Sequence, residues 1–168
     1  MEKKFELTDN FIINAFGVKL FQIKCTKSFK YAKEGDLGGY VEKDENLDQE
    51  SDAWVSGDAR VYGNARVFGN ARVYGNARVY GNAEVYGNAE IDNNNKHCGF
   101  DCFGSANRHT HAYLTKENKV EITCGCFRGS IEEFEKRVEE THSGTIYEKQ
   151  YKAIIDVIKI KFGLTDLI

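Results

Sequence analysis

The chain has 168 residues, of which 41% are hydrophobic and 29% charged, and its formal net charge is −3. This composition is typical of a soluble globular protein, and no apolar run approaches the roughly 20 residues that cross a bilayer. The negative net charge argues against coating of extended nucleic acid, and proline, which a polyproline stalk requires, is absent. The N-terminal sequence MEKKFELTDN has no apolar signal segment. We therefore expect a cytoplasmic protein with reduced thiols and no membrane contact.

Residues 1–37 are predicted to form a small β module. Apolar residues alternate imperfectly along it, and the pair Phe16-Gly17 is typical of a tight hairpin turn. The glycine-rich sequence GDLGGY, residues 35–40, separates this module from the next segment. We expect its strands to cap one open end of the repeat that follows, because an uncapped end exposes backbone groups.

Residues 38–93 are dominated by a hexapeptide repeat, written as ARVYGN in its most regular copies. An alanine stands two places before each aliphatic residue from residue 53 onward, and Gly-Asn pairs supply the corners. The aliphatic positions are Val41, Leu47, Val55, Val61, Val67, Val73, Val79, Val85 and Ile91. Three sides of six residues give an 18-residue turn, and this pattern resembles the hexapeptide-repeat left-handed parallel β-helix. The resemblance implies about three coils, with the aliphatic side chains inside.

Aromatic residues follow the aliphatic position in five of the repeats. They are Tyr62, Phe68, Tyr74, Tyr80 and Tyr86. An exposed apolar surface of this kind usually marks an interface, so we expect a homotrimer, or a multiple of three, packed through these side chains. Two alternatives are that they cover one another as surface ladders, or pack under the flanking modules. The arginines that precede the valines could instead bind phosphates, but glutamates at the end of the repeat oppose that interpretation.

Residues 94–168 are predicted to form an α+β module. Two strands, His111–Thr115 and Lys119–Cys124, flank a three-residue turn. Two helices follow, each opened by a capping box, at Ser130 and at Thr145. Their apolar stripes are assigned to the core rather than to a cofactor site, and consist of Ile131, Phe134 and Val138 in the first helix and of Tyr151, Ile154, Ile155, Ile158 and Phe162 in the second.

Two polar tracts in this module could bind an anion. Residues 94–130 hold five Lys/Arg against three Asp/Glu, a local charge of +2 in an otherwise acidic chain. Side chains that donate to phosphate and a helix N-terminus both attract anions. The candidate ligand-binding residues are Ser105, Asn107, Arg108, His109, Thr110, His111, Arg128, Gly129 and Ser130. The alternative is an ordinary polar strand followed by a capped helix.

A metal or catalytic site is less favoured. The weak zinc candidates are His97, Cys98, Cys102, Cys124 and Cys126. Their number suits zinc, but C-x3-C and C-x-C depart from the usual C-x2-C spacing. No local signature identifies a Cys–His nucleophile, so we predict no metal, no cofactor and no catalytic residue.

Four stretches together resemble phage and prophage hexapeptide-repeat proteins that are uncharacterised or loosely called transferases. They are DLGGYVEKDENL, WVSGDARVYGNARV, GSANRHTHAY and CGCFRGSIEEFEKRVEETHSG. Ala106 stands where the family pattern has an arginine, and Arg108 could replace it. His142 matches a family ETHG-like element, which adds it to the candidate ligand-binding residues.

Three functions follow from this resemblance and from the polar tracts. The first is a phage protein that sequesters a small anionic nucleotide signal, such as a cyclic oligonucleotide or an ADP-ribose derivative, in pockets of a homo-oligomer. The second is an acyl- or acetyltransferase, a common activity of hexapeptide β-helices, although the coils contain no histidine. The third is a trimeric structural or protein-binding module.

Overall fold

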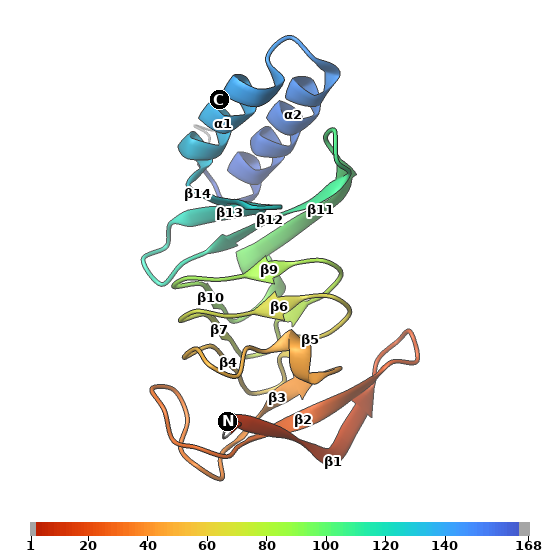
Figure 1. The fold of residues 1–168 in the computed structure, drawn as a ribbon, viewed down its shortest axis with the longest axis vertical. Coiled ribbons are helices and arrows are strands. Elements are labelled where there is room, and N and C mark those ends of the chain that lie inside the picture. The colour runs from red at the N-terminus through yellow and green to blue at the C-terminus, as the bar shows by residue number, and fades with distance from the viewer. Residues whose placement is uncertain (1–2, 165–168) are drawn as a thin grey trace.

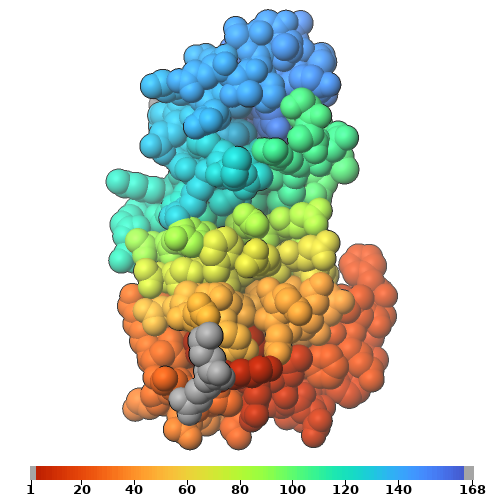
Figure 2. Space-filling model, viewed as in Figure 1, coloured from red at the N-terminus to blue at the C-terminus, as the bar shows by residue number. Residues whose placement is uncertain are grey.

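The structure is a computed structural model that describes residues 3–164. It is mainly β, with two helices at one end (Figure 1). An N-terminal hairpin, the repeat, a second sheet and the helices follow one another along the long axis. Figure 2 shows these layers stacked in chain order, with part of the N-terminal module projecting at one side.

The N-terminal module is an antiparallel hairpin of β1 (Phe5–Ile13) and β2 (Lys19–Cys25). At its turn, Gly17 has a φ of +79°, and the side-chain oxygen of Asn14 accepts hydrogen bonds from two backbone N–H groups. The predicted hairpin turn is confirmed. The next strand, β3 (Leu37–Val41), pairs antiparallel with β2 and parallel with the repeat strand β5 (Arg60–Val61). The hairpin therefore continues one side of the repeat.

The repeat consists of two-residue strands separated by glycine turns. They are β4 (Trp54–Val55), β5 (Arg60–Val61), β6 (Arg66–Val67), β7 (Arg72–Val73), β8 (Arg78–Val79), β9 (Glu84–Val85) and β10 (Glu90–Ile91), and a 3-10 turn, η1 (Asp44–Asn46), precedes them. They form three parallel stacks: β3-β5-β8, β4-β7-β10, and β6-β9 extended by a bridge from Leu47 to Val67. From Val55 onward the stacked aliphatic positions are 18 residues apart, as the repeat predicts, whereas the first turn is two residues longer, with Val41 on Val61 and Leu47 on Val67.

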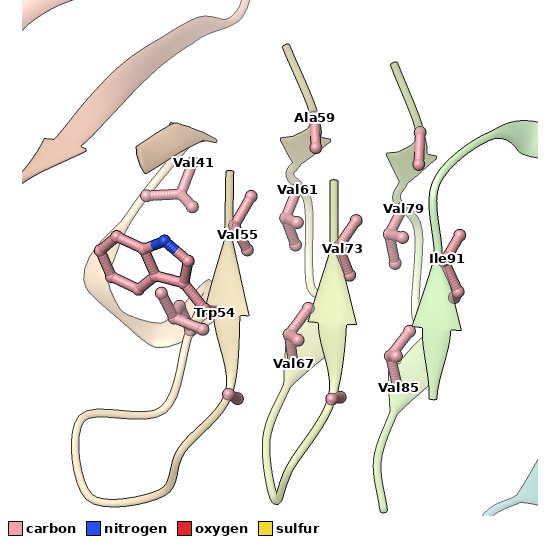
Figure 3. Close-up of a cluster of buried hydrophobic side chains, with 14 of the residues drawn as sticks. Val41, Trp54, Val55, Ala59, Val61, Val67, Val73, Val79, Val85 and Ile91 are labelled. Carbon is pink, nitrogen blue, oxygen red and sulfur yellow. The ribbon is translucent and has the colours of Figure 1, made fainter. Parts of the chain in front are cut away.

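The interior of the repeat is a continuous column of buried aliphatic side chains, mostly valine and alanine (Figure 3). Val55, Val73 and Ile91 are fully buried, as are the valines of the other two stacks. Each buried valine contributes about 1.5–3 kcal/mol relative to an exposed one. Because strands of two residues have few hydrogen bonds of their own, this column and the pairing between turns hold the repeat together.

The lower end of the repeat is closed by the N-terminal module. The Lys4 ammonium is buried and donates to the carbonyl oxygens of Ser51 and Ala53, at 2.7 and 2.8 Å. Burial lowers the pKa of Lys4 to about 8. Phe5 and Ile23 join the same core as the repeat. At this end of the repeat, where no further turn of the described chain supplies backbone N–H groups, the Lys4 ammonium donates to the carbonyl oxygens instead.

The corner glycines offer a matched test of this packing. Gly75 and Gly81 both have a positive φ, +62° and +68°, but a methyl group on Gly75 would overlap the backbone carbonyl of Asp92, whereas at Gly81 it would meet nothing closer than 3.9 Å. Gly81→Ala should cost about 1–2 kcal/mol, the left-handed backbone penalty. Gly75→Ala should cost more, because backbone must also move. Urea unfolding of the two variants measures the difference, and equal losses would contradict the stacking described here.

Above the repeat lies an antiparallel sheet. After η2 (Asn94–Lys96), its strands are β11 (His97–Phe103), β12 (Arg108–Leu114), β13 (Val120–Cys124) and β14 (Phe127–Gly129), in that spatial order. The two predicted strands are present, although β12 begins three residues before the predicted start. Sequence patterning missed β11 and β14. In β11 a bulge at Cys102, which has a φ of +64°, breaks the alternation, and β14 is only three residues long.

Two helices cover the outer face of this sheet, α1 (Ile131–His142) and α2 (Ile146–Lys161). The capping box at Ser130 is confirmed. The second box is a correction: Thr145 caps α2 through the N–H of Glu148, but the Glu148 carboxylate accepts from the N–H of Gly144 rather than of Thr145. The predicted apolar stripes face the core, with Phe162 half-buried at the C-cap.

Candidate functional site

A pocket lies between the β12–β14 edge of the upper sheet and the two helices, with a volume of about 210 Å³. We call it the helix–sheet pocket. Its lining residues are Arg108, Cys124, Cys126, Phe127, Phe134, Arg137, Val138, Thr141, His142 and Tyr151. Two of the predicted ligand-binding residues, Arg108 and His142, are 34 positions apart in the chain, and the fold brings them together in this pocket.

Arg108 is positioned by two tight turns. It begins β12 directly after the Gly104–Asn107 turn, in which Asn107 has a φ of +48°. Its guanidinium lies against the turn at Gly125, where an added Cβ would come within 2.6 Å of an Arg108 nitrogen. Gly125 also has a positive φ, +59°. Glycine at this turn therefore makes room for the arginine at the mouth of the pocket.

Helix α1 contributes the opposite wall. Arg137, Val138, Thr141 and His142 share one face because they are spaced by one, three and one residues along the helix. Neither Arg137 nor Arg108 forms an ion pair within residues 3–164. No Asp or Glu lines the pocket. Among the described residues, the lining therefore carries two guanidinium groups and no carboxylate, which favours an anionic ligand.

Aromatic side chains form the floor. The His142 ring stacks on Tyr151 with centroids 5.5 Å apart and planes at 27°, and Phe134 meets Tyr151 edge-on at 5.6 Å. The Tyr151 hydroxyl lies 3.8 Å from the Cys124 sulfur. Burial, with the neighbouring thiol, raises the pKa of Tyr151 to about 12, so the phenol is neutral. This arrangement can accept an anionic group at the arginines and a planar ring on the floor.

The structure places Arg128, Gly129 and Ser130 elsewhere. Arg128 donates to the Glu121 carboxylate and lies over the Tyr86 ring, 3.7 Å from its centroid. The N-terminus of α1 holds its own carboxylates: Glu133 accepts from the Ser130 N–H at 2.7 Å, and the Ser130 hydroxyl donates to Glu132. These anion-binding groups are therefore already occupied within the chain.

Thr110 and His111 are buried. The Thr110 hydroxyl donates to the Cys124 sulfur on the helix side of the sheet. His111 lies on the opposite side, against the last turn of the repeat, where its Nδ1 is 3.2 Å from the Glu84 carbonyl oxygen. Ser105 and Asn107 are exposed in the turn before β12. The ten candidates are therefore dispersed over several places rather than gathered in one site.

His97, His109 and His111 lie together between the sheet and the repeat; His97 and His111 are hydrogen-bonded to each other, and the His109 ring lies 5.8 Å from that of His111. A carbonyl oxygen only accepts, so His111 carries its proton on Nδ1, and its Nε2 accepts from His97 Nδ1 at 2.9 Å. His109 Nδ1 donates to Asp101 at 2.6 Å. The Nε2 atoms of His97 and His109 are buried and have no partner within residues 3–164.

A second pocket of about 410 Å³ adjoins these histidines, which we call the junction pocket. It also takes in Tyr62, Arg78, Tyr80 and Asp101. A general base must come within hydrogen-bonding distance of its substrate. Because His97 Nε2 and His109 Nε2 are shielded from solvent, the observed arrangement does not present either atom to a molecule in this pocket.

The buried histidines predict a stability that depends on pH. Burial lowers the pKa of His97 to about 4 and that of His111 to about 3. In the unfolded chain both titrate near pH 6.5, so the unfolded state binds more protons as the pH falls below that value. The stability present at pH 7 should drop by roughly 2 kcal/mol for each histidine at pH 5. Urea unfolding at the two pH values, repeated with His97→Gln, tests this. A wild-type free energy that is unchanged between pH 7 and pH 5 would contradict it.

The outward aromatic residues lie on all three sides of the repeat rather than in one patch. Tyr62 stacks on Tyr80 with centroids 5.3 Å apart, and Phe68 contacts Tyr86 at 4.5 Å. Tyr74 belongs to the third side, where the Arg72 guanidinium lies over it at 5.0 Å. Tyr80 is the most exposed of the five, at 56%. Contacts between stacked turns thus cover much of this aromatic surface.

The weak zinc candidates are dispersed as well. Cys98 is half-buried, Cys102 and Cys126 are exposed, Cys124 is buried, and all are free thiols. Within the described residues no group of three His, Cys, Asp or Glu side chains is placed to hold a metal ion. Neither helix of residues 3–164 combines the length and apolarity that a membrane span needs.

Sequence analysis missed Arg137 and Tyr151 as pocket residues. The core stripe predicted for α2 includes Tyr151. That prediction is correct for the buried ring, but it does not show that Tyr151 also lines the helix–sheet pocket. Arg137 stands on an otherwise charged helix, so nothing local distinguishes it. The spacing of Arg137, Thr141 and His142 on one helical face is the signal that could have found this wall.

Comparison with known proteins identifies the repeat but not the site. The family model described as YdcK Beta solenoid repeat matches four overlapping segments, 53–67, 59–75, 65–81 and 71–87. No curated protein matches the chain. The match ends before the upper sheet and the helices, which hold the helix–sheet pocket. Residues 53–87 are therefore similar to the YdcK beta solenoid repeat, which supports a β-solenoid repeat in this part of the chain.

Proposed function

We propose that this protein binds and sequesters a small anionic ligand of the nucleotide type in the helix–sheet pocket. The observation that carries the proposal is the pair of arginines, Arg108 and Arg137, which have no carboxylate partner within residues 3–164 and line the same pocket as the aromatic floor. Guanidinium groups bind phosphate with directed hydrogen bonds, and a nucleobase or ribose can lie on the aromatic rings. The resemblance to phage hexapeptide-repeat proteins supports a phage-encoded, anti-defence role in the host cytoplasm.

The size of the pocket limits what it can hold. Sites for drug-sized molecules usually have volumes of about 300–1,000 Å³, whereas this pocket has about 210 Å³. It suits one phosphate with part of its nucleoside, so a cyclic oligonucleotide or an ADP-ribose derivative would extend beyond it. In the proposed assembly, a homotrimer of left-handed β-helices with three coils each, a neighbouring copy could cover the remainder.

The test is native mass spectrometry of the purified protein mixed with ADP-ribose or with a cyclic dinucleotide. Sequestration predicts one intact nucleotide retained per pocket, and recovery of the unchanged ligand after denaturation. Recovery of a cleaved or transferred product would contradict sequestration. Failure of both ligand types to bind would contradict the nucleotide assignment.

A second candidate function, acyl or acetyl transfer, is favoured by the His109–Asp101 hydrogen bond beside the junction pocket. It ranks below ligand binding because His109 Nε2 is shielded from solvent. Incubation with acetyl-CoA and an amine or alcohol acceptor should release no free CoA thiol above the buffer rate. Turnover that His109→Gln abolishes would replace the first proposal. The third possibility, a trimeric protein-binding module, predicts that Tyr74→Ala weakens partner binding without affecting ligand binding.

A further inference from the structure

The outer face of α2 carries a row of exposed apolar side chains. Ile146, Val157 and Ile160 are 61%, 49% and 65% exposed, and Ala153 is exposed between them. We call these four residues the α2 seam. Its three larger members are among the ten exposed large hydrophobic residues of the described chain. Aliphatic side chains in such a row are unusual on a helix that faces only water.

The seam has the spacing of a coiled-coil interface. Its members are separated by seven, four and three residues, so Ile146, Ala153 and Ile160 take heptad position d and Val157 takes position a. The buried stripe of α2, which includes Tyr151, lies on the other side of the helix. One face of α2 therefore packs on its own sheet and α1, and the opposite face has the period to pack on another helix.

Two charged side chains beside the seam have opposite signs and no ion-pair partner in the described part of the chain, although the Lys161 ammonium lies 5.9 Å from the centroid of the Phe162 ring. Lys152 and Lys159 form ion pairs with glutamates of their own chain. Asp156 and Lys161 form no ion pair within residues 3–164. They stand at positions g and e, five residues apart. In parallel coiled coils, the g residue of one helix contacts the e residue five places later on its partner, so two copies of α2 would match acid with base at both flanks.

We propose that α2 is a parallel dimerisation helix, whose outer face packs against α2 of a second copy of this chain. The seam of each copy supplies the same layers, with Val157 facing the partner's Val157 and Ile160 facing the partner's Ile160. Asp156 of each copy pairs with the partner's Lys161. This interface is separate from the aromatic residues of the repeat and from the helix–sheet pocket, so it does not depend on the proposed ligand.

Sedimentation equilibrium over a range of protein concentrations tests the association. The wild-type chain should reversibly reach twice the mass of the chain with Val157→Glu and Ile160→Glu, whatever association the repeat supplies to both, because two carboxylates would enter each apolar layer of the α2 interface. Leu37→Glu is the matched control: Leu37 is 55% exposed on β3, in the layer farthest from α2, so this variant should associate like the wild type. A wild-type chain that stays monomeric, or a seam variant that associates normally, would overturn the proposal.

Charge reversal tests the pairing. Asp156→Lys should weaken the association about three- to tenfold, because each copy loses an ion pair and gains a repulsion. Adding Lys161→Asp to the same chain should restore it, since the two charges are then exchanged. If the double variant associates as weakly as the single one, Asp156 and Lys161 do not meet across the interface.

Disulfide formation tests the parallel orientation. In a chain with Cys102→Ser and Cys126→Ser, which removes the exposed native thiols, Val157→Cys should form an interchain disulfide on mild oxidation. Lys152→Cys, on the exposed flank, should not. Efficient linkage at position 152 with none at 157 would exclude the proposed geometry. Far-UV circular dichroism of each variant confirms that the helices are intact, so a loss of association reports on the interface.

Discussion

Replacement of Val73 by aspartate should prevent the repeat from folding. Val73 is fully buried and paired on both sides, with Val55 in one turn and Ile91 in the next. The side chains stacked on it in the column are aliphatic (Figure 3). An unpaired carboxylate there should cost more than about 4–5 kcal/mol, a large part of the roughly 5–15 kcal/mol that stabilises a typical protein. Circular dichroism and thermal unfolding would measure the loss.

The matched control is an outward position in the next repeat. Arg78→Asp changes an exposed side chain of β8, and surface changes usually shift the free energy of unfolding by no more than about 0.5 kcal/mol. A Val73→Asp chain that melts cooperatively near the wild-type temperature would show that the valine column is not the source of the repeat's stability.

Arg137→Ala should weaken binding of an anionic nucleotide about 10- to 100-fold. A hydrogen bond to a charged group contributes about 1.5–3 kcal/mol, and Arg137 has no carboxylate partner that competes for its donors within the described chain. Arg108→Ala should have a similar effect, and the double variant should bind no ligand at millimolar concentration. Titration calorimetry with the ligand retained in the mass-spectrometric test measures each affinity.

Arg128→Ala is the control for general charge effects. Arg128 belongs to the same module but is held by Glu121 and Tyr86 outside the helix–sheet pocket. Arg128→Ala changes the net charge of the protein by the same amount as Arg137→Ala. Because Arg128 does not line the helix–sheet pocket, its loss should change the ligand affinity by no more than about twofold, the small change expected of an exposed charge. Equal losses in both variants would indicate long-range attraction rather than a defined site.

The repeat could be predicted because its information is local and redundant. One hexapeptide fixes the inward residue and the corner, and repetition fixes the register, so Val61 could be placed between Val41 and Val79 from spacing alone. The helix caps were similarly predictable at Ser130. At Thr145 the same sequence pattern gave a simple cap, because Gly144, which precedes it with a φ of +74°, presents its N–H to Glu148.

The site could not be predicted because its information is distributed. The helix–sheet pocket draws Arg108 from a strand, Arg137 from α1 and Tyr151 from α2, and only the packing of those elements brings them together. Residues that looked like an anion site locally, such as Ser130, are satisfied by neighbouring carboxylates. The sequence shows which side chains can donate hydrogen bonds, but it does not show which of those donors still lack a partner once the chain has folded.

Hydrogen exchange of the free and the ligand-bound protein tests the proposed binding site most directly. With a retained nucleotide, amide protection should increase in residues 104–108, 124–128 and 137–142, the segments around the helix–sheet pocket. Protection confined to the Tyr62–Tyr80 side of the repeat and to residues 97–101, around the junction pocket, would contradict the assignment and place the ligand beside the histidines.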